Sequence, residues 1–254
     1  MRFAKLHGLG NDFLLLDLRA GGEPLATERA VALCDRHRGV GGDGVLTLLP
    51  GDRMLIQNAD GSVPEMCGNG ARCAALWMVT QGCTRPGTGT VHLLTDAGNK
   101  ACAVAATEAQ RGMVEVEMGI AVVEPARKLG DYDAWPVSVG NPHRVMFVNG
   151  NPLQLAQELG PALCRAEGAN IEFVTRHGRQ AWRAAVYERG AGLTQACGTG
   201  ACAVAAAAVA RGDSLRDEEI LVELPGGELG IVVDGENKVR MRGPAELVFT
   251  GDLP

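Results

Sequence analysis

The feature that most constrains the fold is a short motif that occurs twice. Cys67 opens the stretch CGNGARCAA, and Cys197 opens CGTGACAVAAAA about half the chain further on. Each Cys-Gly-x-Gly leads into a run of strong helix formers that ends at a glycine, and each follows a stretch typical of a β-strand. Because self-similarity over half a chain indicates a repeated unit, we predict two halves of the same architecture.

Strand-like segments outnumber helix-like ones along the rest of the chain. Runs of β-branched, aromatic and apolar residues bounded by Gly, Asn and Asp recur throughout, whereas only 27–37 and 152–164 show a further, weaker helical pattern. The order is too irregular for a simple βαβ sheet. We therefore predict an α+β fold in which each half wraps a curved, mostly antiparallel sheet around a central helix, with the active site in the cleft between the halves.

The composition sets the size and the domain organisation. The chain has 254 residues, 46% of them hydrophobic, which is enough for one large domain or two ordinary ones. We predict an N-terminal half over 1–120, joined by about 245–254, and a C-terminal half over 121–244. The linker is expected near 119–131.

Charge and hydropathy exclude several classes of partner. The 24 Lys and Arg against 30 Asp and Glu give a net charge of −6 without a basic run, so nucleic acid is not an expected partner. The N-terminus has no unbroken apolar core and the chain has no membrane-length apolar stretch, so we expect a cytoplasmic protein without a membrane partner. Most of the eight cysteines are expected to be free thiols there.

The spacing of Cys and His does not fit a metal site. Cys67 and Cys73 are six positions apart, wider than the pairs of structural zinc sites, and the five histidines occur singly. A cysteine directly before a helix instead faces unpaired backbone N–H groups and the positive end of the helix dipole. We therefore expect both Cys67 and Cys197 to be acidified, and the N–H groups of Gly68, Asn69, Gly198 and Thr199 to form a cradle for an anion.

Two acidic thiols on opposite walls of a cleft are suited to one class of chemistry. One thiolate can remove a proton from a carbon while the other thiol returns a proton to its opposite face. The anion cradle would hold a substrate carboxylate, so this scheme needs no cofactor.

The whole chain resembles the diaminopimelate epimerases. The resembling stretches, in family order, are KLHGLGNDF (5–13), GGDG (41–44), NADGSVPEMCGNGARC (58–73), GNPH (140–143), NIEF (170–173), YERGAGLTQACGTGA (187–201) and LPGG (224–227). The resemblance implies a paired α+β fold, a homodimer, and interconversion of LL- and meso-diaminopimelate for lysine and peptidoglycan precursors, without pyridoxal phosphate or metal.

The resemblance also implies roles for individual residues. Cys67 and Cys197 match the catalytic thiolate and thiol, and His143 and Glu188 match positions that tune the cysteine pKa values. A substrate with an amino and a carboxyl group at each end suits asparagine, which both donates and accepts hydrogen bonds, and the planar fork of arginine. The matching substrate-binding residues are Asn11, Asn58, Gly68, Asn69, Asn141, Asn170, Glu188, Arg189, Gly198 and Thr199.

Two positions depart from the family pattern. Gly44 stands where some members carry Gln, which puts a side-chain contact to substrate there in doubt. Phe249 stands where others have Tyr at the dimer contact, so apolar packing is retained without a hydroxyl. LPGG is interpreted as a hairpin turn. Cys73 and Cys202 are interpreted as core residues, and no chemistry is assigned to Cys34, Cys83, Cys102 or Cys164.

Two alternative functions remain open from the sequence. The first is a two-cysteine racemase or epimerase acting on proline or hydroxyproline, whose substrate would leave Arg189 and the asparagines without partners. The second is a redox or sulfur-binding module that uses Cys67 and Cys197 as a reversible disulfide.

Overall fold

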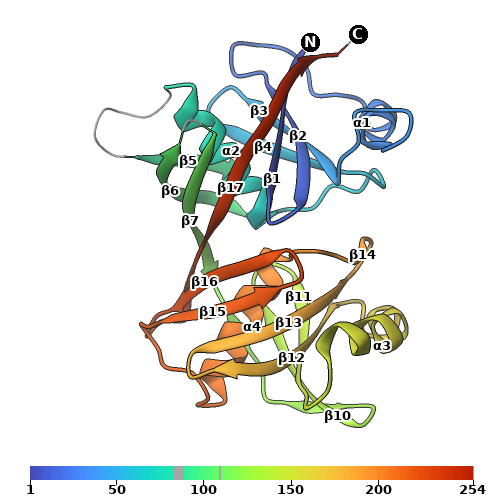
Figure 1. Ribbon diagram of the computed structural model, residues 1–254, viewed down its shortest axis with the longest axis vertical. Coiled ribbons are helices and arrows are strands. Elements are labelled where there is room, and N and C mark those ends of the chain that lie inside the picture. Colours follow the sequence, from blue (N-terminus) through green and yellow to red (C-terminus); the bar gives the residue numbers. More distant parts are fainter. Residues whose placement is uncertain (83–88, 109, 254) are drawn as a thin grey trace. The chain divides into compact units, whose positions relative to one another are not determined.

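The chain forms two compact units in the computed structural model, which describes residues 1–82, 89–108 and 110–253 (Figure 1). The first unit is Met1–Val116 with Gly243–Pro254, and the second is Glu117–Arg242. Two long strands, β7 (Arg111–Ile120) and β17 (Lys238–Asp252), contain the boundaries between the units. None of the helices in the described ranges has the length and apolar character needed to cross a membrane.

The first unit contains two helices, each of which connects two parallel neighbouring strands. Strand β2 pairs in parallel with β3 across α1, and β4 pairs in parallel with β5 across α2, while the other sequential strand pairs are antiparallel. The elements are β1 (Arg2–Gly8), β2 (Asn11–Asp17), α1 (Thr27–Cys34), β3 (Gly44–Leu49), β4 (Arg53–Asn58), α2 (Gly68–Thr80), β5 (Thr90–Thr95), β6 (Gly98–Glu108) and β7.

The second unit repeats this arrangement. Strand β11 pairs in parallel with β12 across α3, and β13 pairs in parallel with β15 across α4. Its elements are β8 (Val122–Val123), β9 (Arg127–Leu129), β10 (Tyr132–Ser138), β11 (Pro142–Phe147), α3 (Pro152–Glu167), β12 (Asn170–Gly178), β13 (Ala181–Glu188), β14 (Gly192–Leu193), α4 (Gly198–Ala210), β15 (Glu219–Leu224), β16 (Gly227–Val233) and β17. The order strand, strand, helix, strand, strand, helix and three strands is common to both units once the short β8, β9 and β14 are set aside, so the predicted α+β fold with two similar halves is confirmed.

The helix that follows each repeated motif is the central element of its unit. Helix α2 is buried from Gly68 to Met78, and α4 from Gly198 to Val209. A helix that is apolar on every side is buried on every side, and small residues let strands approach all around it. Helix α4 accordingly contacts β10, β11, β12, β13, β15 and β16 (Figure 1).

The other two helices of the described residues, α1 and α3, pack on the outside of the sheets. Helix α3 covers a core cluster that contains Met146, Ile171 and Phe173. Its N-terminus is capped by Asn151, whose Oδ1 accepts from the backbone N–H of Leu153 at 3.0 Å. In the first unit α1 packs in the same way on β3 and β4.

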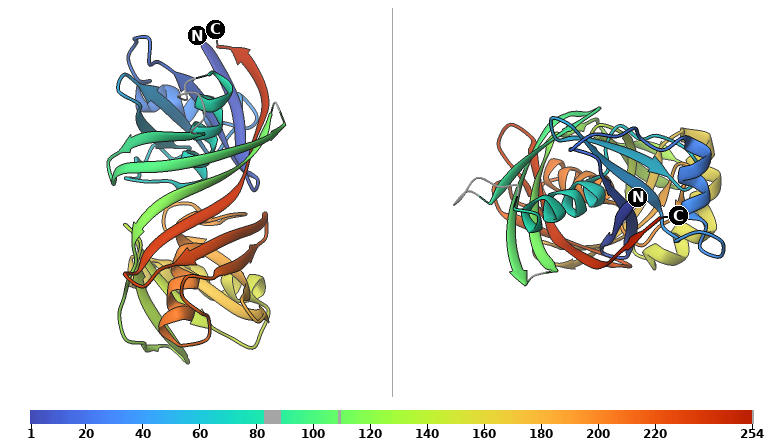
Figure 2. Two further views of the ribbon diagram at one scale, coloured as in Figure 1. Left: turned by 90° about the vertical axis from the view of Figure 1, so that its left-hand side faces the viewer. Right: turned by 90° about the horizontal axis from the view of Figure 1, so that it is seen from above.

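The chain ends lie together within the first unit (Figure 2). Strand β17 pairs antiparallel with β1, so that Arg2 lies opposite Asp252, and the amino group of Met1 donates to the carbonyl oxygen of Leu253 at 3.1 Å. The last residues of the chain therefore complete the sheet that contains the first ones.

Two local expectations have clear outcomes. The linker predicted near 119–131 is wrong, because this segment contains the end of β7 followed by β8 and β9, whose backbone groups pair with β10. The hairpin at LPGG is confirmed, since β15 and β16 pair up to Leu224 opposite Gly227. Cys83 lies outside the described residues.

Candidate active site

Both cysteines of the repeated motif are the N-cap residues of the central helices. Cys67 and Cys197 have extended φ values of −136° and −121°, and each is followed directly by the first turn of a helix. The Cys67 Sγ accepts a hydrogen bond from the backbone N–H of Gly70 at 3.3 Å. Each sulfur therefore lies at the positive end of a helix, among N–H groups that have no partner within that helix.

The second glycine of each motif is required by close packing beside the sulfur. A Cβ atom at Gly70 would lie 2.9 Å from Leu46 Cδ2, and one at Gly200 would lie 3.2 Å from the Cys197 Sγ and 3.1 Å from Glu172 Oε1. No side chain fits at these distances without displacing its neighbours. The Cys-Gly-x-Gly pattern thus lets strands and thiols lie against the start of the helix.

In the first unit, an amide network joins the start of α2 to the turn between β1 and β2. Asn69 Nδ2 donates to Asn11 Oδ1 at 2.9 Å, and Asn11 Nδ2 donates to Asp43 Oδ2 at 2.7 Å. Arg36 pairs with the other oxygen of Asp43 at 2.9 Å. Asp43 thereby orients both asparagines, a role that the sequence analysis missed although GGDG was among its motifs.

Two further residues of the first unit have local surroundings that bear on their expected roles. Asn58 is the last residue of β4, and its Nδ2 donates to Ser62 Oγ in the following turn at 2.9 Å. A Cβ at Gly44 would lie 2.7 Å from the carbonyl oxygen of Gln57. A longer side chain therefore does not fit at position 44 without movement of β4, and glycine is the residue that this strand pair accommodates.

In the second unit, a fully buried histidine connects two site residues. His143 Nε2 contacts Asn141 Oδ1 at 2.9 Å, and Asn141 Nδ2 donates to Thr199 Oγ1 at 3.3 Å. The Thr199 hydroxyl lies 3.6 Å from Cys197 Sγ. On its other side, His143 Nδ1 lies 2.6 Å from Oε1 of Glu172, a buried carboxyl group that the sequence analysis did not assign.

The expectation that Cys197 is acidified is contradicted. Burial raises the pKa of the Cys197 thiol well above its usual value, and the carboxylates of Glu188 and Glu172 raise it further. The hydrogen bond with Thr199 acts in the opposite direction and lowers it. Burial also raises the pKa of Glu188, while the hydroxyl of Thr194 donates to its carboxylate and lowers that pKa. The helix dipole therefore does not decide the acidity of this thiol; desolvation does.

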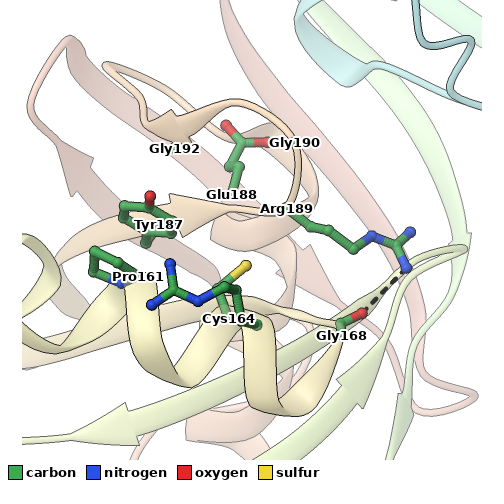
Figure 3. Close-up of a pocket in the computed structure, with 9 residues that line it drawn as sticks. Pro161, Cys164, Gly168, Tyr187, Glu188, Arg189, Gly190 and Gly192 are labelled. Carbon is green, nitrogen blue, oxygen red and sulfur yellow. Dashed lines mark hydrogen bonds between the residues drawn. The ribbon is translucent and has the colours of Figure 1, made fainter.

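Arg189 and Asn170 lie together at the end of β13. Asn170 Oδ1 accepts from the backbone N–H of Arg189 at 2.8 Å, and the guanidinium donates to the carbonyl oxygen of Gly168 at 3.1 Å. Figure 3 shows Arg189 extended toward Gly168, with the Glu188 carboxylate pointing away from it. Gly168, Glu188 and Arg189 line a pocket of about 400 Å³ together with Tyr187 and Cys164.

The other cysteines in the described residues are not N-cap residues of α2 or α4. Burial raises the pKa of Cys73 to about 12 and that of Cys34 to about 11, which keeps both thiols protonated at neutral pH. Cys73 and Cys202 are fully buried inside α2 and α4, as predicted. Within the described part of the chain, no three His, Cys, Asp or Glu residues are grouped so that they could hold a metal ion.

Comparison with known sequences gives one consistent result. The profile of the family described as Diaminopimelate epimerase matches residues 3–124 and 136–248. A protein named diaminopimelate epimerase from Synechococcus elongatus is 40% identical to this chain, with 100% of this chain and 98% of that protein covered. One of the same name from Geobacillus kaustophilus is 37% identical, with 98% and 95% covered.

Solved structures share the fold at low sequence identity. A probable proline racemase from Agrobacterium radiobacter superposes with a TM-score of 0.76 at 16% identity, over 100% of this chain and 92% of that one. A hydroxyproline epimerase from Agrobacterium vitis gives 0.75 at 15% identity, over 99% and 91%. At these identities the likeness extends to the fold alone.

Proposed function

Because the chain belongs to the diaminopimelate epimerase family, we propose that Cys67 and Cys197 are the acid and base of its reaction. The protein is an amino-acid epimerase that interconverts LL- and meso-diaminopimelate in lysine biosynthesis. The observation that supports the assignment of the two thiols is their equivalence: each is the N-cap of the buried central helix in one of two similar units.

The proposed mechanism conserves protons at every step. One sulfur, as thiolate, takes the α-proton of the substrate, while the other sulfur gives its own proton to the opposite face of the same carbon. The sulfurs have then exchanged roles, and the reverse reaction starts from that state. The raised pKa of Cys197 favours the thiol form in the free enzyme, so Cys67 is the thiolate at rest in this scheme.

The binding roles follow the same proposal. The N–H groups of Gly68, Asn69, Gly198 and Thr199 receive the carboxylate next to the reacting carbon, where negative charge also develops in the transition state. Asn11, Asn58, Asn141, Asn170, Glu188 and Arg189 bind the remaining amino and carboxyl groups. The scheme requires no metal or organic cofactor.

Solvent exchange tests the activity directly. The wild-type protein is incubated with LL-diaminopimelate in D2O under reducing conditions, and deuterium at the α-carbons is followed by mass spectrometry. We expect deuterium at the inverted centre and formation of the meso isomer, because the returned proton comes from a thiol that exchanges with solvent. Absence of exchange would remove the proposed function, and exchange of L-proline instead would favour the proline racemase alternative.

We further propose that the protein is a cytoplasmic homodimer. The seven described cysteines are free, as expected in a reducing compartment. Val248 and Phe249 on β17 expose 48% and 46% of their surface. By the resemblance to the family, Phe249 matches the position of its dimer contact. Adjacent exposed apolar side chains on a strand are typical of a surface that pairs with another protein.

Replacement of Phe249 by aspartate is expected to shift the protein from dimer to monomer, because the charge would be buried without a partner at that contact. Sedimentation velocity at several protein concentrations measures the change. Leu215→Asp, at an equally exposed leucine in the second unit, is the matched control and should leave the dimer intact. A dimer that survives Phe249→Asp unchanged would place the interface elsewhere.

A further inference from the structure

We propose that Glu172 is a positioning residue for the reaction: through His143, Asn141 and Thr199 it directs a chain of hydrogen-bond donors at the sulfur of Cys197. This inference rests on the proposed catalytic role of Cys197. Glu172 lies on β12 with its side chain fully buried, and none of the roles assigned so far involves it.

The side-chain amide of Asn141 determines which atom donates at each hydrogen bond of the chain. Asn141 Nδ2 donates to Thr199 Oγ1, so its Oδ1 is the atom that faces His143 Nε2 at 2.9 Å. A carbonyl oxygen only accepts, and Nε2 must therefore carry a proton. A Cys197 thiolate has no proton to give, so in that state the Thr199 hydroxyl is the donor to Cys197 Sγ, 3.6 Å away. Every donor in the chain is thus directed toward Cys197.

Glu172 determines that His143 donates from Nε2 at the start of this chain of hydrogen bonds. Its Oε1 lies 2.6 Å from His143 Nδ1, a separation that requires one proton between the two atoms. With that proton and the one on Nε2, the buried pair is neutral as a whole. If the ring lost the Nε2 proton, a net negative charge would remain in a site without water access, which is costly. The pair therefore keeps Nε2 as a donor.

The sulfur at the end of the chain needs such a donor. Cys197 is faced by the carboxylate of Glu188 from β13 and by Glu172 from β12, with Thr199 of its own helix as the hydrogen-bonding hydroxyl. Burial and both carboxylates oppose a negative charge on the sulfur, yet Cys197 must become a thiolate once it has given up its proton. A hydrogen-bond donor that is held in place, here the Thr199 hydroxyl, stabilises the Cys197 thiolate.

One oxygen of Glu172 supports a positioning role over simple packing. Oε2 is buried and has no hydrogen-bond partner among the described residues, while Oε1 contacts His143. A buried polar atom without a hydrogen-bond partner destabilises the folded protein and is uncommon. A glutamate kept for packing alone would be replaced at lower cost by an apolar side chain of similar size.

The test compares the two thiols within one molecule. In Glu172→Gln the neutral amide can donate or accept, so His143 can take either tautomer and the direction of the chain is no longer imposed. We measure the rate of alkylation of Cys197 and Cys67 by iodoacetamide against pH, by peptide mass spectrometry. Loss of the Glu172 charge lowers the pH midpoint of Cys197, whereas loss of the directed donor raises it, so the change is compared with that of the same substitution in a Thr199→Ala background. The change in the wild-type background should lie about one unit higher than in Thr199→Ala, comparable to the loss of one hydrogen bond, while the midpoint of Cys67 stays unchanged. The kcat should fall about 10-fold to 100-fold.

A matched control exists on the surface of the same unit. Glu223 Oε2 lies 3.6 Å from His177 Nε2, and both side chains are partly exposed. Glu223→Gln therefore removes a carboxylate beside a histidine that has no connection to Cys197, and neither midpoint should move. Equal shifts of both thiols in Glu172→Gln would overturn the proposal.

A double-mutant cycle tests the route through the chain. Thr199→Ala removes the last hydroxyl, whereas Thr199→Ser keeps it and should preserve the wild-type midpoint. If Glu172 acts through this hydroxyl, Glu172→Gln in the Thr199→Ala background leaves only the effect of the lost charge, which is a lower midpoint. The same shift in both backgrounds would show that Glu172 acts by another route and would overturn the proposal.

Two further measurements keep the outcome decisive. Should Glu172→Gln fail to fold, the nitrogen-15 spectrum of His143 in the wild-type protein replaces it, and an Nε2 without a proton would refute the donor order. Deuterium exchange of diaminopimelate by the wild type is measured in parallel. Exchange together with equal Cys197 shifts in the wild-type and Thr199→Ala backgrounds refutes the role of Glu172 alone, and absence of exchange refutes the proposed function itself.

Discussion

Serine in place of Cys67 or of Cys197 is expected to reduce kcat/KM for diaminopimelate by at least about 10³-fold in either case. A positioned acid or base contributes about 10² to 10⁴ in rate, and a serine hydroxyl is a far weaker acid than a thiol. Because proton removal and proton return act on opposite faces of one carbon, neither sulfur can substitute for the other. The measurement is epimerisation of the LL and the meso isomer, followed separately.

The helices that carry these cysteines also supply the controls. Cys73 lies in α2 and Cys202 in α4, and both are fully buried. Cys73→Ala and Cys202→Ala should retain kcat and lose only some stability, because the volume of each side chain is lost from the core. If Cys67→Ser or Cys197→Ser kept the activity of these controls, the two-thiol mechanism would be untenable.

The two equivalent motifs do not create equivalent thiols. Both cysteines begin a buried helix, and from this alone the sequence analysis expected both to be acidified. Cys197 is instead surrounded by buried carboxyl groups on neighbouring strands, and burial dominates its pKa. The helix terminus is a local property that a motif reveals, whereas desolvation depends on strands far away in the sequence.

The fold was predictable because local patterns and their repetition both pointed to it. The small, apolar residues after Cys67 and Cys197 indicate helices buried on all sides, and the structure has them so. The parallel strand pairs were not predictable from the sequence. Each helix connects two parallel neighbouring strands, whereas the sequence predicted a mostly antiparallel sheet. Segment 119–131 shows the same limit: its residues pair as strands only because β10 lies beside them.

The residues missed in the site share a physical reason. Glu172 and Asp43 contact other side chains of the site, so although both lie in stretches that resemble the family, the sequence assigned no role to either. One signal was present for Glu172: a glutamate inside NIEFV, an otherwise apolar strand, must be buried when both faces of that strand are covered. A buried carboxyl group requires a partner, and that requirement points to a histidine nearby.

Strand β12 also connects the site to the stability of the second unit. Glu172 faces the start of α4, where its Oε1 is close to Gly200, and the next residue, Phe173, lies in the core cluster beneath α3. Successive side chains of a strand point to opposite faces, so a single strand supports the chemistry on one side and the packing on the other. Changes at these two neighbours should therefore have separable effects.

Phe173→Ala is expected to lower the free energy of unfolding by about 3–5 kcal/mol, with little change in the kcat of the folded enzyme. The Phe173 side chain is fully buried and its ring meets that of Tyr132 edge to face at 5.9 Å, so truncation leaves a cavity that α3 cannot fill. Urea denaturation measures the loss as a lower midpoint. Phe173→Leu, which keeps most of the volume, should cost less than about 1.5 kcal/mol. A Phe173→Ala variant of full stability but reduced kcat would mean that the two faces of β12 are not independent.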